Sequence, residues 1–267
     1  MAAAVIAFAN NKGGSGKSTC CANVGYCLAL RGRRVLLVDG DMHMNLPLSL
    51  FAEDRALAFA RGENNLYTAI RAERELTDCV VHTAYPNLDL LPSSTLMSGI
   101  ECDLFTKWQR ETVLRRGLER LKNEGGYDYI LIDAPPTLGC WVMNILCAAD
   151  RLVIPVEASP WGLFGLANMF DFLRSVQKIS PELSLLGIVI TKADVRKNYY
   201  KQTRETLAEL PDAHLFRTVI HVDSAIEWSQ DNSMPVVAYK RACRAAQEYI
   251  LLTEELEQLL GSDGKAE

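Results

Sequence analysis

Residues 4–19 read AVIAFANNKGGSGKST, an apolar run that leads directly into a stretch rich in glycine, lysine and hydroxyl side chains. Residues 5–9 are expected to form a buried strand, and the chain after residue 19 has a helical pattern up to Leu30, with a stop at Gly32. Glycines allow positive φ and turn successive N–H groups towards an anion, and the N-terminus of the following helix favours the same ligand. The stretch therefore predicts a phosphate-binding loop.

The candidate residues of this loop form one continuous segment. They are Lys12, Gly13, Gly14, Ser15, Gly16, Lys17, Ser18 and Thr19. Lys17 is predicted to reach the β and γ phosphates of a nucleotide, and the Ser18 hydroxyl is predicted to be a Mg²⁺ ligand. The segment departs from the usual G-x-x-x-x-G-K-S/T pattern, because Asn11 occupies the first glycine position and Lys12 follows it.

Aliphatic runs recur along the chain between longer amphipathic stretches. After the first run, they cover residues 35–38, 88–91, 129–132, 152–156, 186–190 and 218–220. They lack strict alternation of apolar and polar residues, as expected for strands that are buried on both faces of a parallel sheet. Apolar residues recur at helical intervals of threes and fours in two stretches: Leu104, Trp108, Leu114, Leu118 and Leu121, and then Ala242, Ala245, Ala246, Tyr249, Leu256 and Leu260. We predict an α/β fold with a doubly wound, mostly parallel sheet and helices on both faces, of the P-loop NTPase type.

Composition narrows the class of protein further. The chain has 267 residues, of which 49% are hydrophobic and 23% charged, and this excludes disordered and fibrous classes. We expect a single domain over residues 1–260 and a disordered tail over residues 261–267. Residues 52–86 are expected to hold short helices and loops. The eight cysteines form no C-x-x-C pair, so reduced thiols are expected.

The sequence also bears on membranes and nucleic acids. No apolar run approaches the roughly 18 to 20 residues of a membrane span. Residues 254–267 contain five acidic side chains, a poor match to an anionic membrane surface. We therefore expect a cytoplasmic protein without membrane binding. A net charge of −5 excludes a nucleic-acid-binding protein that is basic over its whole surface, so contact with DNA would need a local basic patch.

Acidic residues lie at the ends of two predicted strands. Asp39 and Asp41 follow the strand at residues 35–38, and Asp133 follows the strand at residues 129–132. Because the carboxyl ends of parallel strands line the ligand crevice, the three carboxylates are expected beside the phosphate loop. Asp133 would then hold Mg²⁺ through its water shell.

These segments together resemble a known family. N-N-K-G-G-S-G-K-S-T at residues 10–19 is similar to the deviant Walker A motif of the ParA/MinD superfamily. With V-L-L-V-D-G-D at residues 35–41 and Y-I-L-I-D-A-P-P-T-L-G at residues 129–139, the chain most resembles ParA/Soj DNA-partitioning ATPases over most of its length.

The resemblance implies roles for individual residues. Lys12 corresponds to the signature lysine that reaches across a dimer to the partner's ATP, and Lys17 to the lysine of the phosphate loop. Asp41 corresponds to the residue that orients or activates the attacking water, so Lys12, Lys17 and Asp41 are the implied catalytic set. Ser18, Asp41 and Asp133 are the implied Mg²⁺ site.

The resemblance also implies partners and a cellular role. ATP closes a homodimer, the dimer binds double-stranded DNA without sequence preference, and a ParB-like partner stimulates slow hydrolysis. A nucleoid-associated location follows from this role. The alternative is an ATP switch that positions a non-DNA protein cargo or a secretion or conjugation complex, as MinD-like relatives do.

One segment departs from the family pattern. Relatives usually read D-x-D-P-Q-G-N where residues 39–45 read D-G-D-M-H-M-N, so the geometry of the first switch is altered. His43 is a candidate contact for phosphate or water, or a surface residue without a role. For Asp41 the alternative is an N-cap of a helix that begins at Met42.

Two further patterns carry rival interpretations. Residues 191–194 read T-K-A-D, which matches the T-K-x-D that some GTPases use to read guanine, although the doubled-lysine motif favours ATP. Cys102 and Cys140 invite comparison with the iron–sulphur cysteines of the nitrogenase iron protein, against the simpler interpretation as thiols without a cluster.

Basic residues concentrate in two places in the C-terminal half. The candidate DNA contacts are Arg196, Lys197, Lys201 and Arg204 in the first group, and Lys240 and Arg241 in the second. Such residues would provide affinity for phosphates without reading base sequence. The alternative is that these groups are ordinary solvated helix faces.

Overall fold

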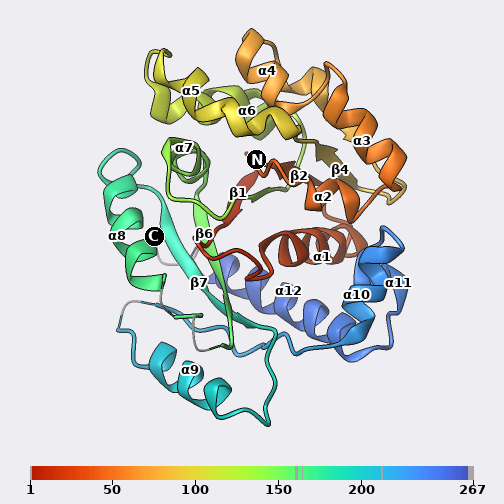
Figure 1. The fold of residues 1–267 in the computed structure, drawn as a ribbon, viewed down its shortest axis with the longest axis vertical. Helices are drawn as coiled ribbons and strands as arrows, with labels where there is room; N and C mark the ends of the chain where they lie inside the picture. Colours follow the sequence, from red (N-terminus) through yellow and green to blue (C-terminus); the bar gives the residue numbers. More distant parts are fainter. Residues whose placement is uncertain (1, 160–161, 164, 212, 264–267) are drawn as a thin grey trace.

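A computed structural model of the chain describes residues 2–159, 162–163, 165–211 and 213–263. Within them the chain folds around a seven-stranded sheet of order β3-β4-β2-β5-β1-β6-β7 (Figure 1). All neighbouring strands are parallel except β3 and β4. The strands are β1 Ala4–Phe8, β2 Val35–Asp39, β3 Val81–His82, β4 Leu88–Leu91, β5 Tyr129–Asp133, β6 Arg151–Glu157 and β7 Ser184–Thr191. The predicted fold class is confirmed.

Helices cover both faces of this sheet. The helices in the first half of the chain are α1 Lys17–Leu30, α2 Asn45–Leu48, α3 Glu53–Arg61, α4 Leu66–Ala72, α5 Ile100–Phe105 and α6 Val113–Glu124. The later helices are α7 Cys140–Ala148, α8 Leu166–Gln177, α9 Asn198–Ala208, α10 Ser224–Asp231, α11 Val236–Tyr239 and α12 Arg244–Asp263. Short 3₁₀ turns are η1 Leu76–Cys79, η2 Thr95–Gly99 and η3 Arg110–Thr112.

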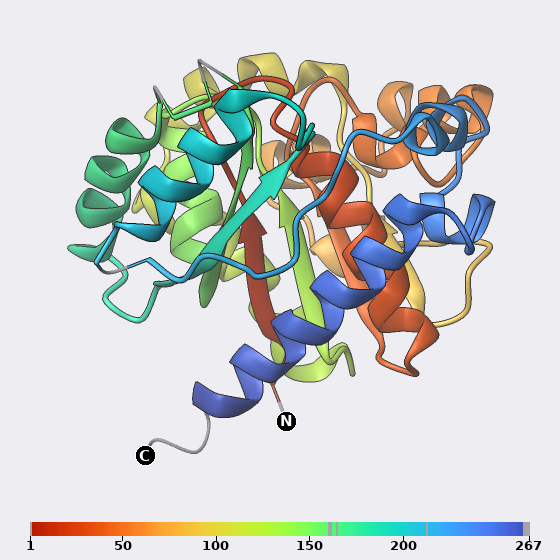
Figure 2. The same ribbon diagram turned by 90° about the horizontal axis from the view of Figure 1, so that it is seen from below.

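Strand β1 shows why the aliphatic runs do not alternate. Val5 and Ala7 are buried in a cluster that includes α4 to α8, whereas Ile6 and Phe8 are buried in the opposite cluster with α1 and α12. Figure 2 shows α1 and α12 side by side across one face of the sheet. Because each face of the strand meets helices, every position is apolar.

The predicted strand at residues 218–220 is wrong. The chain there runs beside β7 and makes only isolated bridges, at Leu215 and His221. Between these bridges, the backbone N–H groups of Arg217 and Thr218 donate to the Glu255 carboxylate on α12, at 2.8 and 3.0 Å. Because those donors bond to a side chain, no continuous ladder forms.

The helical pattern from Leu104 to Leu121 is interrupted. It is divided between α5 and α6, with the 3₁₀ turn η3 between them. Gln109 has a φ of 49°, a left-handed conformation that a helix cannot contain. Trp108, which the spacing assigned to the buried face, is 85% exposed.

The predictions for residues 52–86 and for the C-terminal tail agree with the structure in part. Residues 52–86 contain short helices and loops, as predicted, and also β3, which was not predicted. Helix α12 continues to Asp263, past the predicted start of the tail at residue 261, and residues 264–267 lie outside the described part of the chain. None of the described helices combines the length and the apolar character needed to cross a membrane.

Candidate functional site

The phosphate loop joins the end of β1 to the start of α1. Gly14 and Gly16 have φ values of 73° and 89°, the left-handed region that favours glycine. Gly16 is the N-cap residue of α1 and provides no side-chain cap, so the first N–H groups of the helix stay available. A Cβ atom placed on Gly13 would meet nothing within 4 Å. The loop is therefore an open cradle that fits an anion.

Hydrogen bonds to neighbouring elements hold the phosphate loop in place and leave its outer side free. The Thr191 hydroxyl, at the end of β7, donates to the Ser15 carbonyl at 2.8 Å. The Asn10 side chain donates to the Pro155 carbonyl in β6 at 2.7 Å. Thr19, the last predicted loop residue, accepts a hydrogen bond at 3.3 Å from Gln230 of α10. Strands β6 and β7 and helix α10 thus hold the cradle in place.

Two buried carboxylates lie behind the loop. Asp39 and Asp133 end β2 and β5, are paired across these strands and are fully buried. Burial, and next the charge of Asp133, raise the pKa of Asp39 well above its ordinary value. Burial also raises the pKa of Asp133 to about 7, although nearby Ser18 and Lys17 oppose the rise. The fold therefore disfavours the ionised carboxylates unless a cation joins them.

Several buried oxygens at this place make no hydrogen bond. They are both carboxylate oxygens of Asp133, one oxygen of Asp39 and the hydroxyl of Ser15. Buried polar atoms are normally satisfied, so these orphaned oxygens indicate a site for a bound group. No three histidine, cysteine or acidic side chains within the described residues converge as a metal site. Mg²⁺ commonly takes one or two carboxylates together with phosphates and water, and these residues fit that mode.

The two lysines of the loop have different surroundings. Lys17 is buried, and its ammonium group donates to the Lys12 carbonyl at 3.2 Å. Burial lowers the pKa of Lys17, while Asp133 and Asp41 raise it. Lys12 is partly exposed, forms an ion pair with Glu157 and donates to the Ser159 hydroxyl at 2.9 Å. Within a single chain Lys12 is therefore held at the mouth of the loop by its own subunit.

Asp41 is buried at the edge of the site and belongs to a tight turn. One of its carboxylate oxygens accepts from the backbone N–H of His43 at 3.1 Å and contacts the His43 ring at 2.8 Å. Helix α2 begins only at Asn45, and its N-cap residue is Met44. Asp41 is therefore not the N-cap of a helix that begins at Met42, and that alternative is excluded.

Comparisons with known proteins agree with this geometry. The family described as an AAA domain matches residues 3–185. The sporulation initiation inhibitor protein Soj of Bacillus subtilis is 34% identical over 253 residues, which cover 94% of this chain and 97% of Soj. This chain belongs to the ParA/Soj family of ATPases. The chromosome partitioning protein ParA of Caulobacter vibrioides, also in this family, is 31% identical over 253 residues, which cover 94% of this chain and 93% of that ParA.

A solved structure resembles this ParA/Soj-family chain along almost its whole length. It is cobyrinic acid a,c-diamide synthase from Mycobacterium smegmatis with a bound ATP analogue and magnesium, with a TM-score of 0.84 and 28% identity. The match covers 98% of this chain and 96% of the synthase. The likeness extends over the sheet and the loop described above.

The structure bears on both rival interpretations. In the T-K-A-D segment, both oxygens of Asp194 accept from the Arg196 guanidinium, at 2.8 and 2.9 Å. The carboxylate is thus already paired, which leaves it poorly suited to read guanine. Cys102 is exposed and Cys140 is partly buried, and neither forms a disulfide. No metal-binding group of side chains includes them within one chain, over the residues that are described.

The basic residues form two separate groups on this ParA/Soj-family fold. Lys197, Lys201 and Arg204 are exposed on or beside α9, while Lys240 and Arg241 are exposed after α11. Helices α9 and α11 lie at different sides of the molecule in both ribbon views (Figures 1 and 2). Within one chain these two groups do not make a continuous surface.

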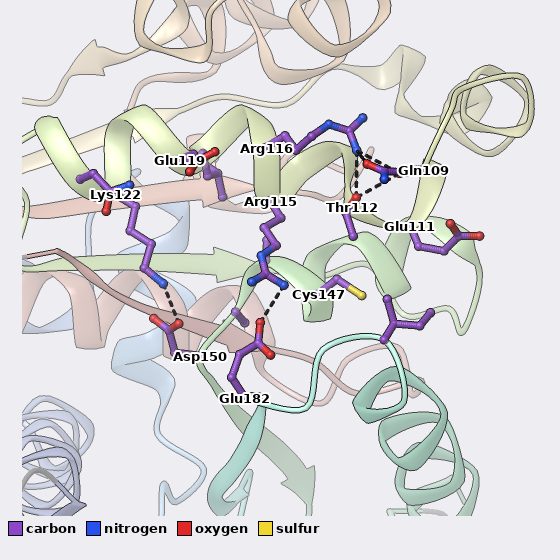
Figure 3. Close-up of a pocket in the computed structure, with 15 residues that line it drawn as sticks. Gln109, Glu111, Thr112, Arg115, Arg116, Glu119, Lys122, Cys147, Asp150 and Glu182 are labelled. Atoms are coloured by element: carbon purple, nitrogen blue, oxygen red, sulfur yellow. Dashed lines mark hydrogen bonds and ion pairs between the residues drawn. The ribbon is translucent and has the colours of Figure 1, made fainter.

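A separate cavity lies away from the phosphate loop. It has a volume of about 790 Å³ and is bordered by α6, the end of α7 and the residues before β7 (Figure 3). Inside it Lys122 pairs with Asp150 at 2.6 Å, and Arg115 pairs with Glu182 at 2.7 Å. Asp150 also accepts from the Val5 N–H, so the cavity lies at the amino ends of the strands. Each of these ion pairs joins two residues that line the cavity. The cavity is not part of the nucleotide site.

Sequence reasoning missed some residues of the site. Glu157, which ends β6 and pairs with Lys12, could have been found because it closes a predicted strand as Asp133 does. A Cβ atom placed on Gly14 would lie 3.8 Å from the ammonium nitrogen of Lys192, so Lys192 borders the loop. Ser159 and Trp141 carried no signal, because their contacts depend on the tertiary fold.

Proposed function

We propose that this ATPase is a DNA-partitioning switch that dimerises with ATP, binds duplex DNA without sequence preference in that state, and drives the segregation or positioning of a chromosome or plasmid. The observation that carries the proposal is the open phosphate loop, with buried, unsatisfied carboxylates behind it and Lys12 at its mouth. Similarity to a chromosome partitioning protein supports the cellular role. The chain would act as a single domain in the cytoplasm, at the nucleoid.

The loop fits the phosphates of ATP together with Mg²⁺. Backbone N–H groups of Gly13, Gly14 and Gly16 would surround the phosphate oxygens, and Lys17 would contact the β and γ phosphates. Ser18 and Asp133 would hold Mg²⁺, with Asp41 near its water shell. When bound, the metal neutralises charge on the phosphate oxygens. Its presence would also favour the ionised forms of the buried carboxylates.

Hydrolysis would use Asp41 and Lys17 of one subunit together with Lys12 of the other. Asp41 would orient the attacking water, because one of its oxygens is held by His43 and the other remains for that task. Lys17 and Lys12 would stabilise the negative charge that spreads over the transferred phosphoryl group. Lys12 would act in the partner subunit, so full activity would need the dimer. A ParB-like partner would then accelerate a slow basal rate.

DNA binding would be a property of the dimer. Each chain has a net charge of −5 and two separate groups of exposed basic residues, so a single chain would bind weakly. Two chains brought together by ATP would double the number of phosphate contacts on one surface. Hydrolysis would separate the chains and release the DNA.

Fluorescence anisotropy with a duplex of arbitrary sequence tests this proposal. Asp41→Ala, which should trap the ATP dimer, is measured with ATP, ADP or no nucleotide at two salt concentrations. We expect tight binding with ATP only, with an affinity that falls steeply as salt rises. The paired change Lys201→Glu and Arg204→Glu should weaken binding, whereas Lys178→Glu at the end of α8 should not. Binding that ignores the nucleotide, or no binding at all, would contradict the proposal.

The alternative function is an ATP switch for a protein cargo. The exposed aromatic side chains of Phe105 and Trp108, at 74% and 85% exposure, are the observation that favours a protein contact. An ATP-dependent dimer that fails to retain DNA at either salt concentration would support this alternative. The same anisotropy measurement therefore separates the two functions.

A further inference from the structure

The first turn of α7 touches the turn that contains Asp41. Trp141 is only 2% exposed, and its indole N–H donates to the Gly40 carbonyl at 2.8 Å in a buried environment. Gly40 stands between Asp39 and Asp41, the two acidic residues after β2. The helix that follows the Asp133 segment is thus hydrogen-bonded to the turn that carries Asp41.

The peptide unit between Gly40 and Asp41 is held at both of its ends. Its carbonyl accepts from Trp141, and its N–H donates to the Asp39 carboxylate at 3.1 Å. A peptide unit is planar, so these two bonds fix the direction in which the chain enters Asp41. The N–H of Gly40 donates in turn to the Asp133 carbonyl at 2.9 Å. The position of Asp41 is thereby tied to that of Asp133.

Close packing leaves this turn little freedom to move towards β5 and α7. A Cβ atom on Gly40 would lie 2.8 Å from the Asp133 carbonyl oxygen and 2.8 Å from the Ile145 side chain. Only glycine fits this close approach. Because glycine has no side chain, it has no side-chain contact of its own that could fix the orientation of this peptide. The indole N–H of Trp141 supplies that orientation from the side of the helix.

The donor itself is anchored. Glu101 of α5 accepts hydrogen bonds from the first two N–H groups of α7, those of Cys140 and Trp141, both at 3.0 Å. A carboxylate at a helix N-terminus is favourable because it meets the positive end of the helix dipole. Trp141 is therefore held at its backbone by Glu101 and at its ring by Gly40.

We propose that Trp141 is a positioning residue for ATP hydrolysis: through the Gly40 carbonyl it holds Asp41 in register with Asp133. The inference rests on the role proposed above for Asp41. Small errors in the placement of a group that orients the attacking water reduce the rate strongly, while leaving the binding of nucleotide largely intact. Trp141 thus acts on turnover and not on affinity.

Trp141→Phe removes the donor and keeps an aromatic ring. We expect kcat for ATP to fall about tenfold, the loss given by one buried hydrogen bond that serves alignment. The Kd for ATP should change less than about threefold. Val142→Ala, on the same helix and buried without a hydrogen bond to the turn, is the matched control and should keep kcat near the wild-type value. An unchanged kcat in Trp141→Phe, or an equal loss in both variants, would overturn the proposal.

A double-mutant cycle separates this proposal from the role of Asp41. If Trp141 acts through Asp41, Trp141→Phe should add nothing to the loss already caused by Asp41→Ala. Independent, additive losses would overturn the positioning role. If Asp41→Ala alone leaves kcat unchanged, the proposed role of Asp41 fails, and the inference fails with it for a distinguishable reason.

A second variant covers the case in which Trp141→Phe does not fold. Benzothienylalanine at position 141 keeps the bicyclic shape and replaces only the N–H by sulphur. We expect the same loss of kcat with a normal melting temperature. Wild-type kcat in this variant would show that the ring shape suffices and would overturn the role of the hydrogen bond.

Discussion

Asp133 is a buried residue whose ionised carboxylate opposes folding. Its carboxylate makes no hydrogen bond, lies opposite Asp39 across the strands, and has a pKa of about 7 because burial disfavours its charge. Functional sites commonly retain such costs, because the ligand later offsets them. The same oxygens that reduce stability in the free chain are those that would hold Mg²⁺.

The stability of Asp133→Asn should reveal this cost. Because the folded state raises the pKa of Asp133 above the ordinary 3.8, ionisation of Asp133 destabilises the fold progressively as pH rises from about 4 to about 7. Asp133→Asn, without nucleotide or Mg²⁺, should therefore melt above the wild type at pH 8 and close to it at pH 4. Calorimetry across this range checks the prediction. The exposed Asp171→Asn is the control, and a pH-independent difference for Asp133→Asn would contradict the account.

Glu157 is the residue that restrains Lys12 within its own chain. The ion pair is partly exposed, with 26% and 27% of the two side chains accessible, and Ser159 adds a hydrogen bond. Although burial raises it, the hydrogen bond and the charge of Lys12 leave the pKa of Glu157 lowered, so the carboxylate stays ionised at neutral pH. In the dimer proposed above, Lys12 would have to leave this partner before it reaches the other subunit.

Glu157→Gln should therefore strengthen ATP-dependent dimerisation. Partly exposed ion pairs contribute about 0 to 1 kcal/mol each, and each dimer would release two of them, so the dimer Kd should fall by up to about thirtyfold. Sedimentation velocity with ATP at a series of protein concentrations measures the shift. Glu182→Gln, which removes an ion pair with Arg115 at the opposite end of the strands, should have no effect. A weaker dimer in Glu157→Gln would instead assign Glu157 to the interface.

At the scale of single residues, local spacing predicted the glycine-rich loop because its conformation depends on consecutive backbone groups. Gly14 and Gly16 adopt the positive φ values that the sequence suggested. The place of Glu157 at the end of a predicted strand could have been found from the sequence, but its partner Lys12 lies 145 positions away. Trp141 contacts Gly40, 101 positions away. No periodicity or motif of one sequence contains such pairings, so the contacts themselves became visible only in the fold.

At the scale of elements, the parallel strands of the sheet were predictable, including the edge strand β7, whereas the short antiparallel β3 was not. The runs at residues 35–38, 88–91 and 129–132 became β2, β4 and β5 because strands with helices on both faces need continuous apolar residues. The run at residues 218–220 did not become a strand, because the backbone N–H groups of Arg217 and Thr218 donate to the Glu255 carboxylate. The helical pattern from Leu104 to Leu121 was broken by the left-handed Gln109. A distant side chain thus prevented the predicted strand, and a local turn interrupted the predicted helix.

Glu255 should accordingly matter for stability. It is 5% exposed, and its carboxylate accepts from two backbone N–H groups and from the Thr218 hydroxyl at 2.9 Å. Glu255→Ala should lower the free energy of unfolding by about 2 to 3 kcal/mol, because hydrogen bonds to a buried charge are strong and their donors would remain unpaired. Urea denaturation measures the loss. Glu254→Ala, on the exposed face of α12, should cost less than about 1 kcal/mol, and equal losses would contradict this assignment.

At the scale of the whole molecule, the charge distribution fits a switch better than a permanent DNA-binding protein. The chain is acidic overall, and its basic groups beside α9 and after α11 lie apart. One of the predicted DNA contacts, Arg196, is paired with Asp194, which reduces its charge available for phosphates. Under the proposed function, tight DNA binding would require two chains joined as a dimer, and ATP in the phosphate loop would be needed to form that dimer.

Light scattering of Asp41→Ala in the presence of ATP tests this account most directly. We predict a mass of twice 29.7 kDa with ATP and a single-chain mass with ADP or no nucleotide. Adding Lys12→Ala should abolish the dimer while ATP still binds, and adding Lys17→Ala should abolish ATP binding itself. A single-chain mass in Asp41→Ala with ATP, or a dimer that persists without Lys12, would contradict the account.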